Sequence, residues 1–360
     1  MSEWKKTSLR DLIVIKNGKD HKKLKNGQYP VYGSGGIMRY ADSYLYDQES
    51  VLLPRKGTLN NIQFVTEPFW TVDTCYYTVV NRDKVLPYFL YCCLCKMDIQ
   101  SLNTGSAVPS MTFEKYYSIP PLSTQHRIAS ILSRYDSLIE NYQKQIKLLE
   151  EAAQRLYKEW FVDLHFPGHE NTKIVDGVPE GWEKKKVADV VVFYDKMRKP
   201  LSSMQRQSME KIYPYYGAAS LMDYVDNYLF DGTYLLMGED GTVISNEKYP
   251  MLQYVWGKFW VSNHAHVLQG KEPYSTEFIY MMLKQMTILD VVTGAAQPKI
   301  SQGRLAAKEI IMPANELVKE YDKIVVPMIQ QAKSLQSQIR LLTEARDRLL
   351  PKLMSGEITV

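Results

Sequence analysis

The chain has 360 residues, of which 45% are hydrophobic and 23% charged, and its formal net charge is +4. These proportions are ordinary for folded domains, and the length favours two or three of them. No apolar stretch approaches the roughly 18 residues needed to span a membrane, and the first residues lack the apolar core of a signal peptide. The composition therefore predicts a cytoplasmic protein with no membrane partner.

Residues 1–121 mix short β-like runs with Gly, Pro and Asn turns. The runs at 50–54 and 76–80 have the residue types of strands, and the apolar run at 87–98 predicts a short helix. With 15 Lys+Arg against 11 Asp+Glu, this segment is the most basic of the chain. Five of its lysines cluster between positions 16 and 25, which suits phosphate contacts but is equally typical of a solvated loop.

Two later segments, 122–166 and 314–360, have the apolar spacing of long helices with a narrow seam. We expect them to pair antiparallel within the chain, because pairing buries both seams; the alternative is two separate struts. Pro327 lies early in the second segment, so its regular helix is expected to begin or kink there. The expected seam positions are Ile128, Ile131, Tyr135, Leu138, Tyr142, Leu149, Ala152, Leu156 and Trp160, and then Tyr321, Ile324, Met328, Leu335, Ile339, Leu342, Ala345, Leu349 and Leu353.

Residues 182–313 repeat the first segment after a turn-rich connection at 167–181. The blocks 29–58 and 213–242 align without a gap and share 13 of their 30 residues. Matched turn and aromatic residues, at a shift of about half the chain, indicate two copies of one domain. A shared frame with divergent loops is typical of two recognition modules with different specificities.

Motifs for catalysis are missing from the sequence. It has no GxxxxGK[ST] phosphate loop, no Asn/Asp-Pro-Pro-Tyr motif, no GxSxG elbow and no HExxH helix. The glycines at 33–36 begin like a dinucleotide loop, but Met38 occupies the third glycine position, so we expect a tight turn after a strand. The chain is therefore interpreted as a binding protein rather than an enzyme.

Metal-ligating residue types occur without the usual spacing. His264 and His266 could place two imidazoles on one face of a strand, but no third ligand lies nearby in sequence, so we expect no metal site. Cys92, Cys93 and Cys95 share one apolar run and lack paired CxxC spacing. They are interpreted as buried free thiols, with a zinc site as the alternative.

The loop around Arg55 and Lys56 contains these two cations, a glycine turn and three side chains that form hydrogen bonds. Its counterpart keeps the glycine and the following threonine but has Glu239 and Asp240 in place of the cations. Arg and Lys favour guanine O6 and N7, whereas Glu and Asp accept from the cytosine amino group, so the two loops suit direct base readout. The alternative is a pair of ordinary hairpin tips with solvated charges.

A second pair of matched segments, 104–109 and 293–298, begins with Thr-Gly and ends with proline. Glycine lets the backbone approach a phosphate, and the hydroxyls of Thr or Ser can bond to it. Gln297, Lys299 and Ser301 extend this surface in the second copy. A tight structural turn explains the same residues.

Taken together and in this order, the motifs resemble the specificity (S) subunits of type I restriction-modification systems. The matching runs are YPVYGSGG at 29–36, VLLPRKGT at 51–58, NTGSAVPSMTF at 103–113, PPLSTQHRIASIL at 120–132, YPYYGAAS at 213–220, TGAAQPKIS at 293–301 and RLLPKLMSGEI at 348–358. The resemblance implies an α+β fold of two repeated, mixed α/β target recognition domains, separated by two long antiparallel helices in an intrachain coiled coil with pseudo-twofold symmetry. The implied boundaries are 1–121 and 182–313 for the recognition domains, 122–166 and 314–360 for the helical regions and 167–181 for a linker.

The same resemblance implies a non-catalytic subunit, each of whose recognition domains reads one half of a bipartite, asymmetric DNA site. The helices would set the spacing and dock two methyltransferase (M) subunits, and restriction (R) subunits would join them. S-adenosylmethionine, ATP and magnesium are expected on those partners, so this chain is expected to bind no cofactor. The alternatives are a stand-alone DNA methyltransferase or nuclease, and a coiled-coil scaffold without DNA readout.

The residues expected to contact double-stranded DNA are polar, cationic or aromatic side chains of the matched segments. They are Lys22, Lys23, Tyr32, Ser34, Arg39, Arg55, Lys56, Thr58, Asn60, Thr104 and Ser106 in the first copy, and Lys196, Arg198, Lys199, Tyr216, Glu239, Asp240, Thr242, Gln297, Lys299 and Ser301 in the second. The acidic pair makes the second copy less obviously suited to DNA than the first.

Overall fold

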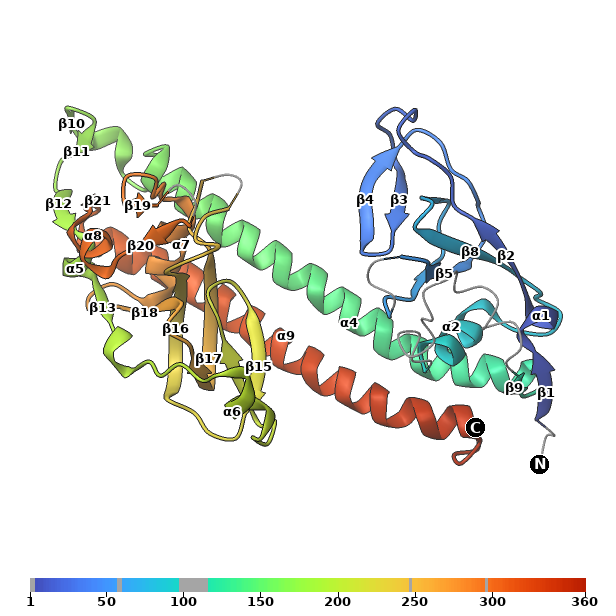
Figure 1. Ribbon diagram of the computed structural model, residues 1–360. Helices are drawn as coiled ribbons and strands as arrows, with labels where there is room; N and C mark the ends of the chain where they lie inside the picture. Colours follow the sequence, from blue (N-terminus) through green and yellow to red (C-terminus); the bar gives the residue numbers. More distant parts are fainter. Residues whose placement is uncertain (1–3, 57–59, 97–115, 246–247, 295–296) are drawn as a thin grey trace. The chain divides into compact units, whose positions relative to one another are not determined.

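The computed structural model describes residues 4–56, 60–96, 116–245, 248–294 and 297–360. The chain folds into two compact units: the first unit comprises residues 1–142 and 338–360, and the second unit comprises residues 143–337. Two long helices, α4 (Leu122–Tyr157) and α9 (Asn315–Ser355), each contribute residues to both units (Figure 1). The units therefore divide the chain within its helices, whereas the segments expected from the sequence divide it at the helix ends.

Besides its parts of the two long helices, the described portion of the first unit consists of short strands and two short helices. A four-stranded sheet has the order β2 (Ile13–Asn17), β8 (Cys75–Val80), β5 (Ser50–Pro54), β6 (Gln63–Val65). A three-stranded sheet has the order β4 (Gly36–Ala41), β3 (Tyr29–Gly33), β7 (Trp70–Thr71), and β1 (Lys5–Ser8) pairs with β9 (Tyr116–Ile119). The helices are α1 (Leu9–Leu12) and α2 (Pro87–Cys95).

The second unit repeats this plan with longer strands. A six-stranded sheet has the order β13 (Val191–Phe193), β18 (Ala265–Gly270), β16 (Phe230–Gly238), β17 (Leu252–Val261), β14 (Tyr213–Tyr216), β15 (Leu221–Val225). The two-stranded pairs are β12 (Glu183–Lys186) with β21 (Glu309–Met312), β19 (Val292–Thr293) with β20 (Lys299–Ile300), and β10 (Ile174–Val175) with β11 (Val178–Pro179). The helices are η1 (Lys158–Val162), η2 (His169–Asn171), α5 (Val187–Val190), η3 (Asp195–Met197), α6 (Ser203–Gln207), α7 (Thr276–Gln285) and α8 (Gln302–Ala307).

The repeat extends to strand pairing. In the first unit β3 runs parallel to β7 with Tyr32 opposite Thr71, and in the second unit β14 runs parallel to β17 with Tyr216 opposite Val261. Both parallel pairs continue into an antiparallel hairpin, β3–β4 and β14–β15. The turn expected at 33–36 is therefore the hairpin between β3 and β4, and the dinucleotide loop is excluded at this position.

Matched side-chain hydrogen bonds fix the alignment of the two copies further. The indole Nε1 of Trp70 donates to the carbonyl of Lys19 at 2.9 Å, and that of Trp260 donates to the carbonyl of Lys199 at 2.7 Å. These bonds make Lys199 the equivalent of Lys19. Much of the identity between the copies therefore reflects shared packing, because the same turns need the same partners.

One identical pair shows the packing reason directly. A Cβ atom at Gly33 would lie 2.7 Å from Sδ of Met38, and one at Gly217 would lie 2.3 Å from Sδ of Met222. In both copies the methionine of the second hairpin strand lies over the glycine of the first. Neither glycine can become a larger residue without displacing the methionine.

The two long helices pair antiparallel, as expected. Within the second unit, the hydroxyl of Tyr321 near the start of α9 donates to the carbonyl of Ala153 near the end of α4 at 2.9 Å. Within the first unit, Arg346 near the end of α9 pairs with Asp136 in the first half of α4 at 2.7 Å. The helix α9 begins at Asn315, twelve residues before Pro327, and continues through that proline. Of the two expectations for Pro327, a helix start is therefore wrong.

The expected seam of α4 is wrong by one residue at four positions. Ile128 in α4 and Trp160 in η1 are buried as expected, and Tyr135, Tyr142 and Leu149 are half-buried. At the other expected positions the buried residue is the one that follows, namely Leu132, Ile139, Ala153 and Tyr157. In α9, Tyr321, Leu335 and Leu353 are buried, whereas Ile324 is 41% exposed and its neighbour Val325 is buried. The reason is that each helix also covers a domain core. Tyr157, for example, contacts Phe278 of α7 as well as Tyr321.

The cysteines expected as buried thiols lie mainly in the core of the first unit. Cys92 and Cys93 are buried on α2, next to Leu90 and Phe89, and Cys95 is the exposed member of the group. Among the described residues, no helix combines the length and the apolar composition that a membrane span requires.

Candidate nucleic-acid interface

The two charged loops identified in the sequence occupy equivalent places in the two copies. Leu53 of β5 lies opposite Tyr76 of β8, and Met237 of β16 lies opposite His266 of β18. Each strand then ends in a loop, which we call the strand-end loop: it begins at Arg55 in the first unit and at Glu239 in the second. Arg55 and Glu239 are therefore equivalent by strand register, and so are Tyr76 and His266.

In the first unit the strand-end loop is cationic. The guanidinium of Arg55 lies over the ring of Tyr76, with 5.6 Å between Cζ and the ring centroid. This distance is within the range of a cation–π contact, which orients the side chain while leaving its N–H groups available. Lys56 and Asn60 are exposed beside it. The described residues of this loop therefore present positive charge at the end of the sheet.

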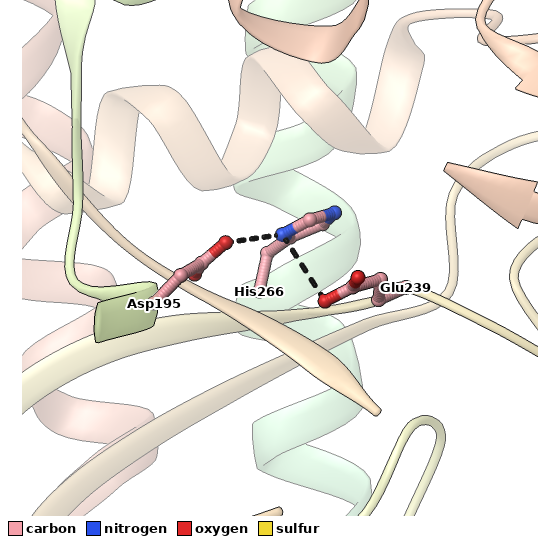
Figure 2. Close-up of side chains that lie close together, drawn as sticks. All are labelled: Asp195, Glu239 and His266. Carbon is pink, nitrogen blue, oxygen red and sulfur yellow. Dashed lines mark hydrogen bonds and ion pairs between the residues drawn. The ribbon is translucent and has the colours of Figure 1, made fainter. Parts of the chain in front are cut away.

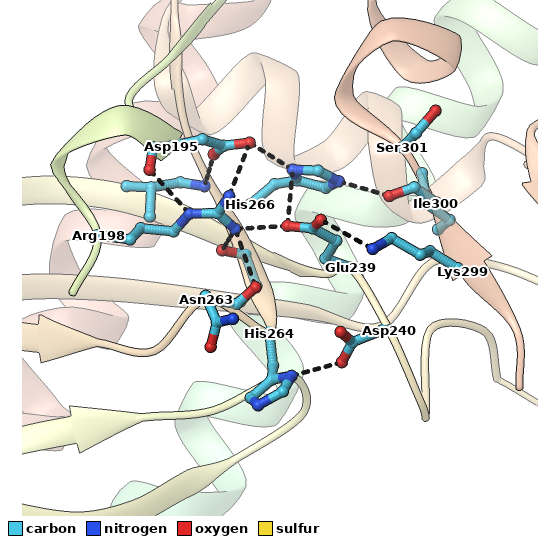
Figure 3. A network of polar contacts seen from close by, with 12 residues as sticks. Asp195, Arg198, Glu239, Asp240, Asn263, His264, His266, Lys299, Ile300 and Ser301 are labelled. Carbon is cyan, nitrogen blue, oxygen red and sulfur yellow. Dashed lines mark hydrogen bonds and ion pairs between the residues drawn. The ribbon is translucent and has the colours of Figure 1, made fainter. Parts of the chain in front are cut away.

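In the second unit Glu239 belongs to a network of ions (Figure 3). Its Oε2 lies 2.6 Å from Nη1 of Arg198 and 3.8 Å from Nδ1 of His266, and its Oε1 lies 3.7 Å from Nζ of Lys299. The carboxylate is thus surrounded by cationic or hydrogen-bonding groups, and its side chain is only 16% exposed. The acidic loop, which made the second copy less obviously suited to DNA, is compensated by its own protein neighbours.

The strand-end loop and the Thr-Gly segment of the second unit lie side by side. Asp240 forms a β-bridge with Lys299, the N–H of Ile300 donates to the carbonyl of Glu239 at 2.8 Å, and the N–H of Gly241 donates to the carbonyl of Pro298 at 3.1 Å. The two candidate segments of the second copy, about 55 residues apart in sequence, therefore form one surface. Their counterparts 104–109 in the first copy lie outside the described residues, as do Thr58, Thr104 and Ser106.

The two histidines of β18 have different partners. Nδ1 of His264 lies 2.6 Å from Asp240 at the surface, and Nδ1 of the buried His266 lies 2.6 Å from Asp195. Figure 2 shows His266 between Asp195 and Glu239, and ligand atoms of these three residues lie within 4.8 Å of one another. A divalent cation favours such a donor set, but here the guanidinium of Arg198 already contacts both carboxylates. The three residues therefore form one ion network with Arg198.

Several predicted residues of the first copy lie at the surface and others are already engaged. Lys22 and Lys23 are exposed. Nη2 of Arg39 donates to the carbonyl of Leu24 at 3.1 Å and to Oδ1 of Asn26 at 3.0 Å, so this arginine holds the lysine-rich loop. The carbonyl of Ser34 accepts from Nδ2 of Asn61.

Two equivalent tyrosines among the predicted residues pack into the sheets. Tyr32 meets Phe69 edge-on at 6.2 Å between ring centroids, and Tyr216 meets Phe259 edge-on at 5.9 Å. Burial raises the pKa of Tyr32 to about 12, and burial raises the pKa of Tyr216 as well. Their identity in both copies is therefore accounted for by aromatic packing.

In the second copy five members of the predicted set are exposed. They are Lys196, Lys199, Thr242, Gln297 and Lys299. Ser301 has a different task, since its Oγ accepts from the N–H of Arg304 at 3.3 Å and caps α8. Arg198 is directed inward, with 13% of its side chain exposed.

Sequence reasoning missed Asp195 and Tyr76 as parts of this site. Asp195 is separated from His266 by 71 residues, and nothing in the local pattern around it indicates a partner. The repeat could have revealed Tyr76, because an alignment that allows for the insertion in the second copy makes Tyr76 the equivalent of His266.

Comparison with known proteins agrees with this geometry. The sequence model of the family described as "Type I restriction modification DNA specificity domain" matches residues 1–151 and 179–339. The type I restriction enzyme MjaIX specificity subunit of Methanocaldococcus jannaschii is 24% identical over 347 residues, covering 88% of this chain and 79% of the relative. A putative type I restriction enzyme specificity subunit of Haemophilus influenzae, S.HindORF215P, is 34% identical over 153 residues, covering 42% of this chain and 38% of the relative.

A solved structure shares the fold over nearly the whole chain. The S subunit of a type I restriction-modification system from M. genitalium superposes with a TM-score of 0.63 at 18% identity, covering 98% of this chain and 96% of that one. Two matched halves, two paired helices and two equivalent strand-end loops thus accompany a family match to both halves. The chain belongs to the family of type I restriction-modification DNA specificity domains, as a specificity subunit with two such domains.

Proposed function

We propose that this specificity subunit reads a bipartite DNA site, with one half-site contacted by the strand-end loop of each unit. The observation that carries the proposal is the equivalence of Arg55 and Glu239. The same strand register delivers an exposed cationic loop in one copy and a compensated acidic loop in the other. A shared frame with opposite polar groups at the same position is the arrangement that two different half-sites require, since base edges are distinguished by donors and acceptors.

The surroundings of each loop support contact with a phosphate backbone. Lys22, Lys23 and Lys56 are exposed in the first unit, and Lys196, Lys199 and Lys299 in the second. Neutralising phosphates with such cations supplies affinity without sequence preference, and the loops would then add discrimination.

The helices α4 and α9 would set the distance between the two half-sites and dock two methyltransferase subunits. Support comes from the antiparallel contacts found in each unit. The chain itself would act without catalysis, and the methyltransferase and restriction subunits would carry S-adenosylmethionine, ATP and magnesium.

Methylation-sensitive sequencing of DNA from cells with and without the gene for this chain tests the proposal. The expected result is a two-part methylated motif with a fixed gap that disappears when the gene is deleted. An unchanged methylation pattern, in cells that contain its methyltransferase partner, would contradict the role.

Purified protein separates this role from the two alternatives. The chain alone should bind duplex DNA with an affinity that falls steeply with salt, and it should neither methylate nor cut DNA. Methyl transfer or cleavage by the chain without partners would indicate a stand-alone enzyme, and binding that is absent at low salt would indicate a scaffold.

A further inference from the structure

A buried hydrogen-bonded centre lies directly behind the strand-end loop of the second unit. Nδ1 of His266 lies 2.6 Å from Oδ2 of Asp195, and its Nε2 lies 2.9 Å from the carbonyl of Ile300. The other carboxylate oxygen of Asp195 accepts from the N–H of Val267 at 2.9 Å. The side chains of His266 and Asp195 are 1% and 4% exposed. Because both ring nitrogens face oxygen acceptors, the imidazole joins η3, β18 and β20 in one arrangement.

Arg198 closes the same centre from the surface side. Its Nη1 donates to Glu239 at 2.6 Å and to the carbonyl of Ala265 at 2.7 Å, and its Nε donates to the carbonyl of Asp195 at 2.9 Å. With its donors occupied in this way, the guanidinium reaches DNA only by giving up bonds that hold the loop. Figure 3 shows the bond from Arg198 to Glu239, so any contribution of Arg198 to recognition would pass through Glu239.

Arg198 binds only one of the two carboxylate oxygens of Glu239. Arg198 holds Oε2, whereas the partner of Oε1 is Lys299 at 3.7 Å, whose side chain is 52% exposed. The backbone of Glu239 is fixed as well, since its N–H donates to the carbonyl of His264 and its carbonyl accepts from Ile300, both at 2.8 Å. Oε1 is thus a positioned acceptor whose ion partner, Lys299, is itself half exposed.

The first unit has no room for an arginine at the position equivalent to Arg198. The residue equivalent to Arg198 is Gly18, which precedes Lys19, and a Cβ atom there would lie 2.0 Å from the carbonyl oxygen of Val72. The residue equivalent to His266 is Tyr76, whose ring supports Arg55. The centre around His266 is therefore a feature of the second copy rather than of the shared frame.

We propose that His266 and Arg198 are positioning residues that fix Glu239 as an acceptor for the exocyclic amino group of one base, cytosine N4 or adenine N6, in the half-site of the second unit. The inference rests on the proposed function and names the chemistry that this half-site must present. The physical reason is preorganisation, because a carboxylate that is already oriented loses little conformational entropy when it binds. It also cannot turn to suit a base that lacks the amino group, so such a base binds more weakly.

The test uses the full chain in complex with its methyltransferase partner and duplexes in which each position of the two half-sites is varied in turn. The variants are His266→Asn, His266→Gln and Arg198→Ala, with Arg198→Lys as the conservative change at the partly exposed rim. Leu283→Ala is the matched control, because Leu283 is fully buried in α7 of the same unit and is no part of this centre. All proteins are compared at a temperature at which melting curves show them folded.

The expected result is a loss of preference, about five- to 150-fold, at one base pair of the second half-site, with the first half-site unchanged. Arg198→Lys should retain part of that preference, and Leu283→Ala all of it. Wild-type preference in the His266 and Arg198 variants would overturn the inference, and so would an equal loss in the Leu283 control, which marks a merely structural role. If the unaltered complex shows no two-part preference at all, the proposed function fails instead.

Discussion

Arg55 and Glu239 carry opposite charges at one and the same position of the fold. Each donates its main-chain N–H at 2.8 Å to the carbonyl of the residue that precedes the facing strand by one, Thr74 for Arg55 and His264 for Glu239. The backbone geometry is therefore held constant while the side chain changes from donor to acceptor. Recognition can diverge at such a position without any cost to the frame around it.

Replacing Arg55 tests base reading in the first half-site. If the guanidinium contacts a base, Arg55→Ala should relax specificity at one position of one half-site by roughly 1–3 kcal/mol. Competition binding with singly substituted duplexes measures this. Lys22→Ala is the control, since an exposed phosphate contact should weaken all sequences alike and lower the salt slope by about one. Uniform weakening by Arg55→Ala would reassign Arg55 to the phosphate backbone.

Lengthening the helices tests their role as a spacer. Seven residues inserted into α4 between 138 and 149, with seven at the antiparallel position of α9 around 334, add about 10 Å, which corresponds to about three base pairs. Sequencing of methylated DNA should show a gap longer by that amount and unaltered half-sites. Insertion into α4 alone is the control, because it breaks the antiparallel register. A gap of the original length after the double insertion would refute the spacer role.

Asp322 predicts a pH-dependent stability. Burial, followed by the nearby Glu277, raises its pKa to about 6, against an opposing hydrogen bond from Ser275. Because the folded state holds this proton more tightly than the unfolded state, stability falls as pH rises from about 4 to 6 and stays lower above that window. Asp322→Asn removes the effect and should stabilise the second unit above pH 6 by about 1–2 kcal/mol, after discounting for partial exposure.

Melting curves of the wild type and Asp322→Asn at pH 4.5 and pH 7.5 provide the measurement. The gain should be present at the higher pH and small at the lower one. Asp223→Asn should show the opposite pH dependence. Hydrogen bonds from Lys211 and Tyr224 lower the pKa of Asp223, so its ionised form stabilises the fold above its unfolded pKa. That contribution to stability is lost as pH falls. A gain at pH 4.5 as large as at pH 7.5 for Asp322→Asn would exclude titration as its cause.

The pair of Arg346 and Asp136 predicts a local loss of stability in the first unit. Asp136 accepts from Arg346 at 2.7 Å and from the hydroxyl of Tyr88 at 2.5 Å, so Arg346→Ala leaves a half-buried carboxylate with one partner fewer. We expect a loss of about 1–2 kcal/mol. Hydrogen exchange of the α2 amides and of the end of α9 reports it locally. Arg348→Ala, which removes an exposed pair with Glu344, should cost less than about 0.5 kcal/mol, and equal losses would contradict the argument.

The secondary structure and the twofold repeat of this protein could be predicted from its sequence, because they depend on local residue patterns. The hairpin at Gly33, the helix at Pro87 and the equivalence of Arg55 with Glu239 follow from turn residues, apolar runs and the repeat. The seam of α4 was misplaced by one residue because a helix that faces both a partner helix and a domain core has a wider apolar stripe than a heptad pattern describes.

The contacts of the site could not be predicted in the same way. Arg198 is among the residues predicted to contact DNA, and the structure shows it bonded to Glu239, 41 residues away. His266 is one of two imidazoles predicted on a strand face, and it lies 2.6 Å from Asp195, 71 residues away. Residue type alone does not distinguish a charge that binds a ligand from one that binds another charge of the same chain. Only the strand register, which brings these segments together, settles the matter.

The contribution of both long helices to each unit has a consequence for biosynthesis. Leu353 and Met354, within the last eight residues of the sequence, are buried in the core of the first unit beside Ile128 and Leu132. A chain emerging from the ribosome can form the strands of the first unit, but that core stays open until Leu353 and Met354 have been translated. A premature stop before codon 353 would therefore damage the first unit, although most of that unit precedes residue 143.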